Sequence, residues 1–149
     1  MSPATPTPGL PDGAAVRGGL AVLLVEDSPV LVERVHELLQ AMPEIGRVRT
    51  VDREAAAVEA LAEGVPSWDV LVLDLHLKQG TGFGVLRALR RQPGLQPVVV
   101  VLTNHDVPGY RSRTHALGVQ HFLDKARDFE RLGELLREIH SARGSAPNA

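Results

Sequence analysis

The sequence contains no cysteine, and only five of its 149 residues are aromatic. The lack of cysteine excludes disulfide bonds, thiolate zinc sites and cysteine nucleophiles, and it fits a reducing compartment. No apolar run approaches the roughly 18 residues that a membrane-spanning helix needs. The N-terminus shows no basic segment followed by an apolar run, so no signal peptide is predicted. These absences favour a soluble, cytoplasmic protein without membrane insertion.

The sequence has no large excess of one charge, because it contains 16 basic and 18 acidic residues. No basic stripe of the size of a duplex footprint is recognised, which argues against direct nucleic-acid binding as the main function. Both ends are rich in small residues, proline and glycine, and they have little apolar surface with which to fold. We therefore predict flexible tails over residues 1–19 and 142–149, and one domain over residues 20–141.

Five short apolar runs alternate with helical patterns along this domain. The predicted strands cover residues 20–25, 46–51, 69–73, 97–102 and 119–123. The first, third and fourth runs are almost wholly aliphatic, which is typical of parallel strands covered by helices on both faces. The second and fifth contain polar residues, as edge strands do. This alternation predicts an α/β fold with a doubly wound parallel sheet.

Local signals predict where the helices begin. Ser28 is a predicted N-cap with Pro29 in the first turn of the helix that follows the first strand. Asp52 is predicted to cap the second helix. Few apolar residues occur between residues 107 and 117, so the fourth helix is expected to be short and mobile.

Polar side chains follow four of the five predicted strands. They are Glu26, Asp27, Asp74, Thr103 and Lys125. The carboxyl ends of parallel strands meet at one edge of the sheet, where ligands bind. Two carboxylates about 4 Å apart repel by about 4 kcal/mol at an effective dielectric constant near 20. Three of them require a compensating cation or a raised pKa, and hard oxygen ligands favour Mg²⁺. With an ammonium and a hydroxyl nearby, such a site suits a phosphoryl group and an aspartate nucleophile.

Residues 20–141 resemble the receiver domain of bacterial two-component response regulators. The resemblance is carried by Glu26-Asp27 after LAVLLV, Asp74 in DVLVLDLHLKQGTGFGVLRALR, Thr103 in PVVVVLT and Lys125 in GVQHFLDK. It implies a flavodoxin-like fold with five strands in the order 2-1-3-4-5. Because the resemblance covers the whole predicted domain, it leaves no output domain, and a stand-alone, single-domain regulator is expected.

The resemblance also implies a role for each matching residue. Asp74 would accept the phosphoryl group, and the protein would catalyse only its own phosphorylation and dephosphorylation. Thr103 and Lys125 would hold the phosphoryl oxygens, while Thr103 and Phe122 would form a conformational switch. The implied Mg²⁺ ligands are three carboxylates and one backbone carbonyl: Glu26, Asp27, Asp74 and His76.

The implied phosphodonor is a sensor histidine kinase or a histidine phosphotransfer protein. The signal would leave by contact with an unidentified downstream protein. The face formed by the fourth helix, fifth strand and fifth helix is the expected contact, and it is also the candidate face for a homodimer.

Three positions depart from the family pattern. Ala126 replaces a frequent proline after the lysine, Lys78 replaces a frequent proline four residues after the acceptor, and Asn104 replaces a small residue. They leave open a second hypothesis, a receiver-like binding module that works without phosphorylation. A metal-dependent phosphohydrolase is a third hypothesis. It is disfavoured because His76 stands where such enzymes carry a second acid.

At two places in the sequence, a purely structural role is an alternative to a functional one. Glu26 and Asp27 could simply cap the following helix, since acidic residues favour helix N-termini. Arg87, Arg90 and Arg91 are interpreted as a solvated helix face.

Overall fold

The computed structural model describes residues 18–63, 68–94, 96–104 and 107–145. Most of the tail predicted over residues 1–19 lies outside these ranges. The strands are β1 (Leu20–Val25), β2 (Ile45–Val51), β3 (Val70–Leu73), β4 (Val98–Thr103) and β5 (His121–Asp124). The helices are α1 (Pro29–Gln40), α2 (Glu54–Ala62), α3 (Gly82–Arg90), α4 (Tyr110–Ala116) and α5 (Phe129–Ser145).

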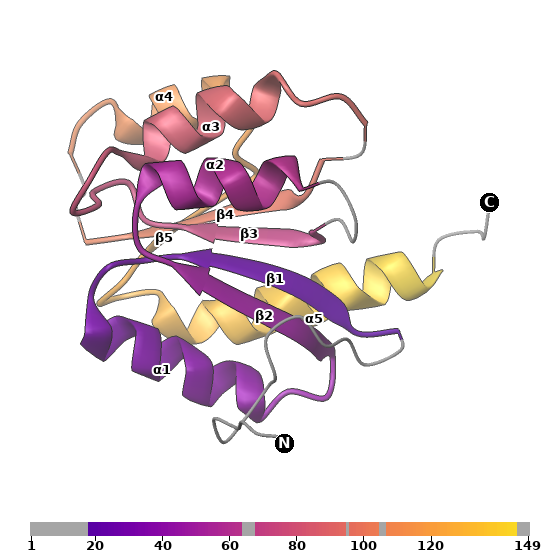
Figure 1. Cartoon of the computed structure of the whole chain (residues 1–149). Coiled ribbons are helices and arrows are strands. Elements are labelled where there is room, and N and C mark those ends of the chain that lie inside the picture. Colours follow the sequence, from indigo (N-terminus) through magenta and orange to yellow (C-terminus); the bar gives the residue numbers. More distant parts are fainter. Residues whose placement is uncertain (1–17, 64–67, 95, 105–106, 146–149) are drawn as a thin grey trace, which may run out of the picture.

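The five strands form one parallel sheet in the order β2-β1-β3-β4-β5. The doubly wound sheet, its strand order and the edge positions of β2 and β5 are thereby confirmed. Helices α1 and α5 cover one face, and α2, α3 and α4 cover the other (Figure 1). Strand boundaries differ from the predicted ones by at most two residues. Among the described residues, no helix combines the length and the hydrophobicity needed to cross a membrane.

Two apolar cores lie on the two faces of the sheet. Alternate residues of a strand point to opposite faces. Val22 and Leu24 therefore pack in the core that contains residues of α1 and α5. Leu23 and Val25 pack in the core that contains residues of α2 and α3. This two-sided burial explains why β1 is aliphatic at every position.

The predicted start of α1 is confirmed, and the predicted cap of α2 is wrong. Ser28 is the N-cap of α1, and its Oγ accepts a hydrogen bond from the Leu31 backbone N–H at 3.4 Å. Helix α2 instead begins at Glu54, with Arg53 at the N-cap and no side-chain cap. The Asp52 carboxylate lies one residue too early, and its Oδ1 accepts from Arg53 Nε at 3.1 Å.

Helices α4 and α5 differ in how firmly they are attached. Helix α4 has seven residues, as short as expected, and Thr114 is its buried residue. Helix α5 continues to Ser145, beyond the expected boundary at residue 141. Arg143 Nη1 lies 3.1 Å from Asp69 Oδ1, and its Nη2 donates to the Asp69 carbonyl at 3.1 Å. These contacts join the last turns of α5 to the start of β3.

Candidate functional site

The polar residues predicted at the strand ends are held there by the sheet itself. The hydrogen bonds between neighbouring strands continue past the ends of the strands. The bonds run from the Glu26 N–H to the Val51 carbonyl at 2.9 Å, from Asp74 to Val25 at 3.0 Å, and from Lys125 to Thr103 at 3.0 Å. Each of these backbones is therefore fixed by the strand beside it.

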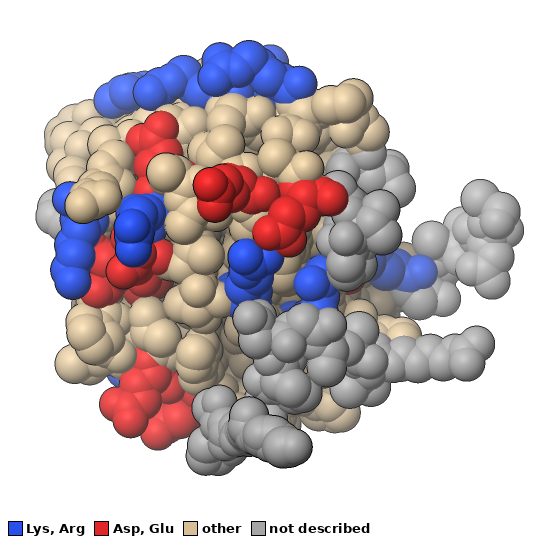
Figure 2. Space-filling model, viewed as in Figure 1, with Lys and Arg blue, Asp and Glu red and all other residues tan. Residues whose placement is uncertain are grey.

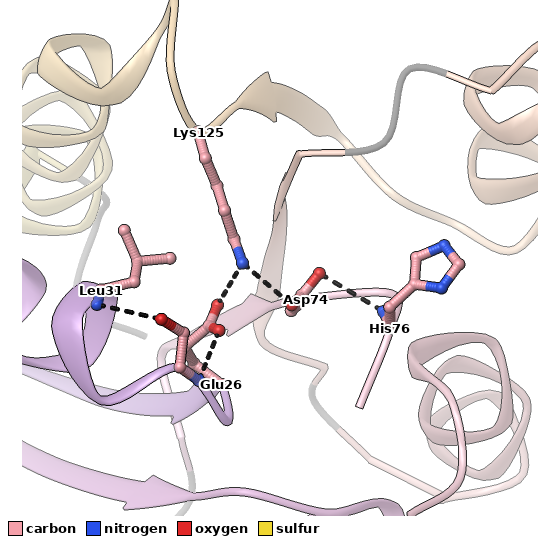
Figure 3. Close-up of polar contacts among 6 residues, drawn as sticks. Glu26, Leu31, Asp74, His76 and Lys125 are labelled. Atoms are coloured by element: carbon pink, nitrogen blue, oxygen red, sulfur yellow. Dashed lines mark hydrogen bonds and ion pairs between the residues drawn. The ribbon is translucent and has the colours of Figure 1, made fainter. Parts of the chain in front are cut away.

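The side chains of these residues converge on one point. Glu26, Asp27 and Asp74 each offer a carboxylate oxygen, and the three oxygens lie within 4.8 Å of one another. Lys125 Nζ lies 2.9 Å from Glu26 Oε1 and 2.9 Å from Asp74 Oδ2. Figure 3 shows the ammonium reaching down between the two carboxylates. Glu26 and Asp74 are 1% and 5% exposed, and Lys125 is 8% exposed, so these charges face each other largely shielded from water.

Burial and charge act in opposite directions on the ionisable groups. Burial favours the neutral form of Lys125, but the Glu26 and Asp74 carboxylates outweigh it and raise the lysine pKa above its ordinary value. Burial also raises the pKa of Glu26, and the negative charge of Asp74 adds to this effect, while Lys125 and the Ser28 backbone oppose it. The lysine is thus held as an ammonium ion at neutral pH.

The carboxylates have unused acceptor capacity toward a cation. The Ser28 N–H donates to Glu26 Oε2 at 3.0 Å, and the His76 N–H donates to Asp74 Oδ1 at 3.3 Å. Glu26 Oε1 is buried without a hydrogen-bond partner among the described residues. It is paired with the Lys125 ammonium at 2.9 Å. A buried oxygen in an all-oxygen donor set fits a hard divalent cation such as Mg²⁺.

The two predicted switch residues occupy different surroundings. Thr103 ends β4 and is 1% exposed. Phe122, on β5, is half-buried, and its ring lies under the guanidinium of Arg111 at 4.5 Å from the ring centroid. In the strand register Phe122 pairs with Val101, two residues before Thr103. Their roles in a switch stay predictions.

Glu54 is a contributor that the sequence reasoning missed. Its Oε1 accepts a hydrogen bond from the Thr81 N–H at 2.9 Å, and its own N–H donates to the Gln79 carbonyl at 3.0 Å. The side chain fills the space where Gly80, with φ +82°, would carry a Cβ atom. Helix α2 therefore clamps the loop that follows Asp74. In the sequence, glycine occupies every second position of GTGFG, and this pattern indicates that another segment packs closely against the loop.

Gly82, at the other end of this loop, lies close to the backbone of Asp74 and Leu75. A Cβ atom there would overlap the backbone carbonyl of Asp74 and the backbone of Leu75. Its N–H donates to the Leu75 carbonyl at 3.0 Å. The first turn of α3 thus lies directly against the candidate acceptor.

A second missed contact joins the site to α4. The Tyr110 hydroxyl lies 3.2 Å from His76 Nε2, and the two rings are 5.7 Å apart. The Tyr110 ring also meets Phe83 edge-on at 5.2 Å. His76 follows Asp74 by two residues, so this contact connects the acceptor loop to the least buried helix.

The departures from the family pattern have visible local consequences. The Ala126 N–H, which a proline would lack, donates to Asp124 Oδ1 at 2.8 Å. The N–H groups of Arg127 and Ala126 hold the pKa of Asp124 below its ordinary value. Asn104 is exposed and, with Lys125, lines a cavity of about 260 Å³ beside the site. Lys78 is exposed and lines another cavity of about 500 Å³ with Glu26 and Asp27.

The five-stranded parallel sheet with acidic residues and a lysine at its carboxyl edge defines a receiver-type α/β domain. The family model of the response regulator receiver domain matches residues 22–137. The chain belongs to this family, which defines a phosphoacceptor domain of two-component signalling.

Relatives and solved structures agree with this assignment. The chain is 32% identical over 126 residues to the two-component response regulator ORR1 of Oryza sativa subsp. japonica, covering 78% of this chain and 54% of that protein. It is 32% identical over 124 residues to the nitrate/nitrite response regulator protein NarP of Escherichia coli (strain K12), covering 83% of this chain and 55% of NarP.

Among solved structures, a similar one is the receiver domain of the sensor histidine kinase PA1611 from Pseudomonas aeruginosa, with a magnesium ion coordinated in its active-site cleft. Its TM-score is 0.70 at 27% identity, and the match covers 83% of this chain and 98% of that one. The chain spans about half the length of ORR1 and of NarP.

Proposed function

We propose that Asp74 accepts a phosphoryl group from a phosphohistidine. The observation that carries this proposal is the contact of Lys125 Nζ with Asp74 Oδ2 at 2.9 Å, beside two further carboxylates. In the step proposed, an Asp74 carboxylate oxygen attacks the phosphorus atom and the P–N bond to the imidazole breaks. The departing histidine recovers its ring electron pair, and Asp74 becomes an aspartyl phosphate. Water later attacks the phosphorus atom, the P–O bond to Asp74 breaks, and inorganic phosphate leaves while the Asp74 carboxylate is restored.

Mg²⁺ is the proposed cofactor of this step. Glu26, Asp27, Asp74 and the backbone carbonyl of His76 are the residues that would hold it. When bound, the ion neutralises charge on the phosphoryl oxygens during transfer. Three carboxylate oxygens within 4.8 Å of one another, faced by a single ammonium, support this choice, because buried negative charges require compensation.

The remaining residues orient the phosphoryl group and report its presence. The Lys125 ammonium and the Thr103 hydroxyl donate to phosphoryl oxygens. Movement of Thr103 toward the phosphoryl group frees space that the Phe122 ring then fills. Helix α4 follows because few buried side chains fix it to the sheet.

The proposed partners follow from this chemistry. A sensor histidine kinase or a histidine phosphotransfer protein supplies the phosphoryl group. The signal leaves by protein contact at the face of α4, β5 and α5, which is also the proposed face of a homodimer.

The proposal is tested by labelling the protein with a small phosphodonor in the presence of Mg²⁺. Wild-type protein is expected to incorporate phosphate whose bond is labile to base and hydroxylamine, and Asp74→Asn is expected to incorporate none. Asp52→Asn is the matched control, because Asp52 is a half-exposed aspartate that lies outside the carboxylate cluster. Equal labelling of Asp74→Asn and wild type would show that Asp74 is not the acceptor.

A second candidate function is a receiver-like module that binds its partner without phosphorylation. The observation in its favour is the set of departures at Lys78, Asn104 and Ala126, all of which line the cavities beside the site. Addition of Mg²⁺ and beryllofluoride distinguishes the two functions. Phosphorylation-dependent signalling predicts chemical-shift changes around Phe122, and the binding module predicts none.

A further inference from the structure

Five exposed arginines lie on or directly after the neighbouring helices α3 and α4. Arg87 and Arg90 lie in α3, Arg91 follows its last turn, and Arg111 and Arg113 lie in α4. All five are exposed, and we call them the arginine surface. Figure 2 shows a row of basic side chains along the edge of the molecule where Figure 1 places α3 and α4. Neither helix contains an aspartate or a glutamate.

The arginine surface is not neutralised within the described part of the chain. The ion pairs found there involve arginines of other elements, Arg49, Arg53, Arg127, Arg137 and Arg143, together with Lys125. Arg90 Nη1 donates to the Ala116 carbonyl at 3.0 Å, which fixes the end of α4 to α3.

Two of the guanidinium groups are held in place by aromatic rings. Arg113 stacks on Phe83 at 4.0 Å from the ring centroid, and Arg111 stacks on Phe122 at 4.5 Å. Stacking uses the planar faces of a guanidinium and leaves its N–H edge available. An N–H edge fixed in this way donates two parallel hydrogen bonds to a carboxylate at a reduced cost in side-chain entropy.

We propose that the arginine surface binds an acidic segment of a partner protein, and that this binding responds to the state of Asp74. The proposal rests on the function proposed above, because the response requires phosphorylation of Asp74. Arg111, through its contact with Phe122 of β5, is where the arginine surface borders the α4, β5 and α5 face. Charge complementarity identifies the segment as rich in glutamate or aspartate.

The surroundings of the arginine surface favour an acidic protein segment over a nucleic acid. Helix α2 lies beside α3 and carries the exposed carboxylate of Glu59. Acidic side chains gather beneath the basic row in Figure 2. A phosphate backbone that continued beyond α3 would run along these carboxylates and be repelled, since charges within about 10 Å of one another interact at physiological salt. A short acidic segment stays on the two basic helices.

Arg111 connects this surface to the acceptor. Its guanidinium covers the Phe122 ring, and Phe122 is the aromatic residue proposed to turn inward when Asp74 is phosphorylated. When the ring leaves, Arg111 loses its stacking partner and its N–H edge changes position. The affinity for the acidic segment therefore differs between the two states of Asp74.

The test measures binding of a short fluorescent Glu-rich peptide to the full chain, with and without Mg²⁺ and beryllofluoride. Arg87→Ala with Arg91→Ala removes two charges from the arginine surface. Arg49→Ala with Arg53→Ala removes two charges from β2 and the residue before α2, outside the arginine surface and outside the α4, β5 and α5 face, and is the matched control. Phosphorylation of Asp74 is measured on every variant. Duplex DNA and vesicles containing anionic lipid are the competing probes.

The expected result is binding that weakens with added salt and is roughly fivefold to tenfold weaker in the α3 variant only. Addition of beryllofluoride is expected to change the affinity of the wild type. Equal losses in both variants, or tighter binding of DNA or vesicles, would overturn the proposed partner. Equal affinity with and without beryllofluoride would overturn the response to Asp74. Absence of peptide binding alongside normal labelling of Asp74 would reject this inference and leave the proposed function standing.

Discussion

The Tyr110 hydroxyl lies 3.2 Å from His76 Nε2, so one contact joins α4 to the second residue after Asp74. Tyr110→Phe removes this contact and keeps the ring against Phe83. We expect faster amide hydrogen exchange in α4, while the free energy of unfolding falls by about 1 kcal/mol or less, because the bond is exposed. Hydrogen exchange monitored by mass spectrometry checks both effects. Unchanged protection of α4 would mean that this contact does not hold the helix.

Glu54 is expected to matter more than Glu59, the other acidic residue of α2. Glu54→Ala leaves the Thr81 N–H without its acceptor and opens a space beside Gly80. We expect the free energy of unfolding to fall by about 1–2 kcal/mol and phosphorylation of Asp74 to slow. Urea denaturation and phosphodonor labelling provide the measurements. Glu59→Ala, at an exposed position of the same helix, is the control, and equal effects of the two substitutions would contradict the clamp.

His36 makes stability depend on pH. Its Nε2 lies 2.8 Å from Thr50 Oγ1, and burial lowers its pKa from the ordinary value of 6.5. Near and below that value the unfolded chain binds the proton more readily than the folded one. The contribution of His36 is therefore fully present above pH 6.5 and is lost as the pH falls through the lowered pKa.

His36→Gln removes this titration while keeping a polar group near Thr50. Urea denaturation between neutral and mildly acidic pH should show a stability that falls less steeply in the variant than in the wild type. Parallel profiles for the two proteins would assign the pH dependence to other groups.

The end of α5 is expected to stabilise the domain. Arg143→Ala breaks the contacts with Asp69, and we expect it to lower the free energy of unfolding by about 0.5 kcal/mol, since both side chains are partly exposed. Removal of residues 142–149 should lower it by about 1 kcal/mol, because the last turns of the helix are lost as well. The midpoint of urea denaturation checks both. Arg131→Ala is the control, and a truncated protein with an unchanged midpoint would identify the segment as a dispensable tail.

The sheet and the positions of the site residues were predictable from the sequence for a physical reason. Strands buried on both faces must be aliphatic, and the residues directly after them must lie at one edge of the sheet. The convergence of Glu26, Asp27 and Asp74 follows from these two rules. Their roles in phosphoryl transfer stay predictions.

Contacts between distant segments were not predictable in the same way. Glu54 and Thr81 are 27 residues apart, and Tyr110 and His76 are 34 apart, so no local pattern links them. The residue type of Asp52 favours a helix cap, but its carboxylate accepts a hydrogen bond from Arg53 Nε instead. The end of α5 depends on Asp69, which lies far away in the sequence.

The hydrogen bonds that join Glu26, Asp74 and Lys125 to neighbouring strands place the candidate reactive residues in the most cooperative part of the molecule. The amides of these residues can exchange only when the sheet opens, so their protection should report global unfolding. Among the described residues, helix α4 forms no backbone hydrogen bond to a strand, so we expect it to open more readily than the sheet. The candidate reactive residues are therefore expected to stay in place until the whole domain unfolds. Helix α4 is expected to change its position more easily when Asp74 is phosphorylated.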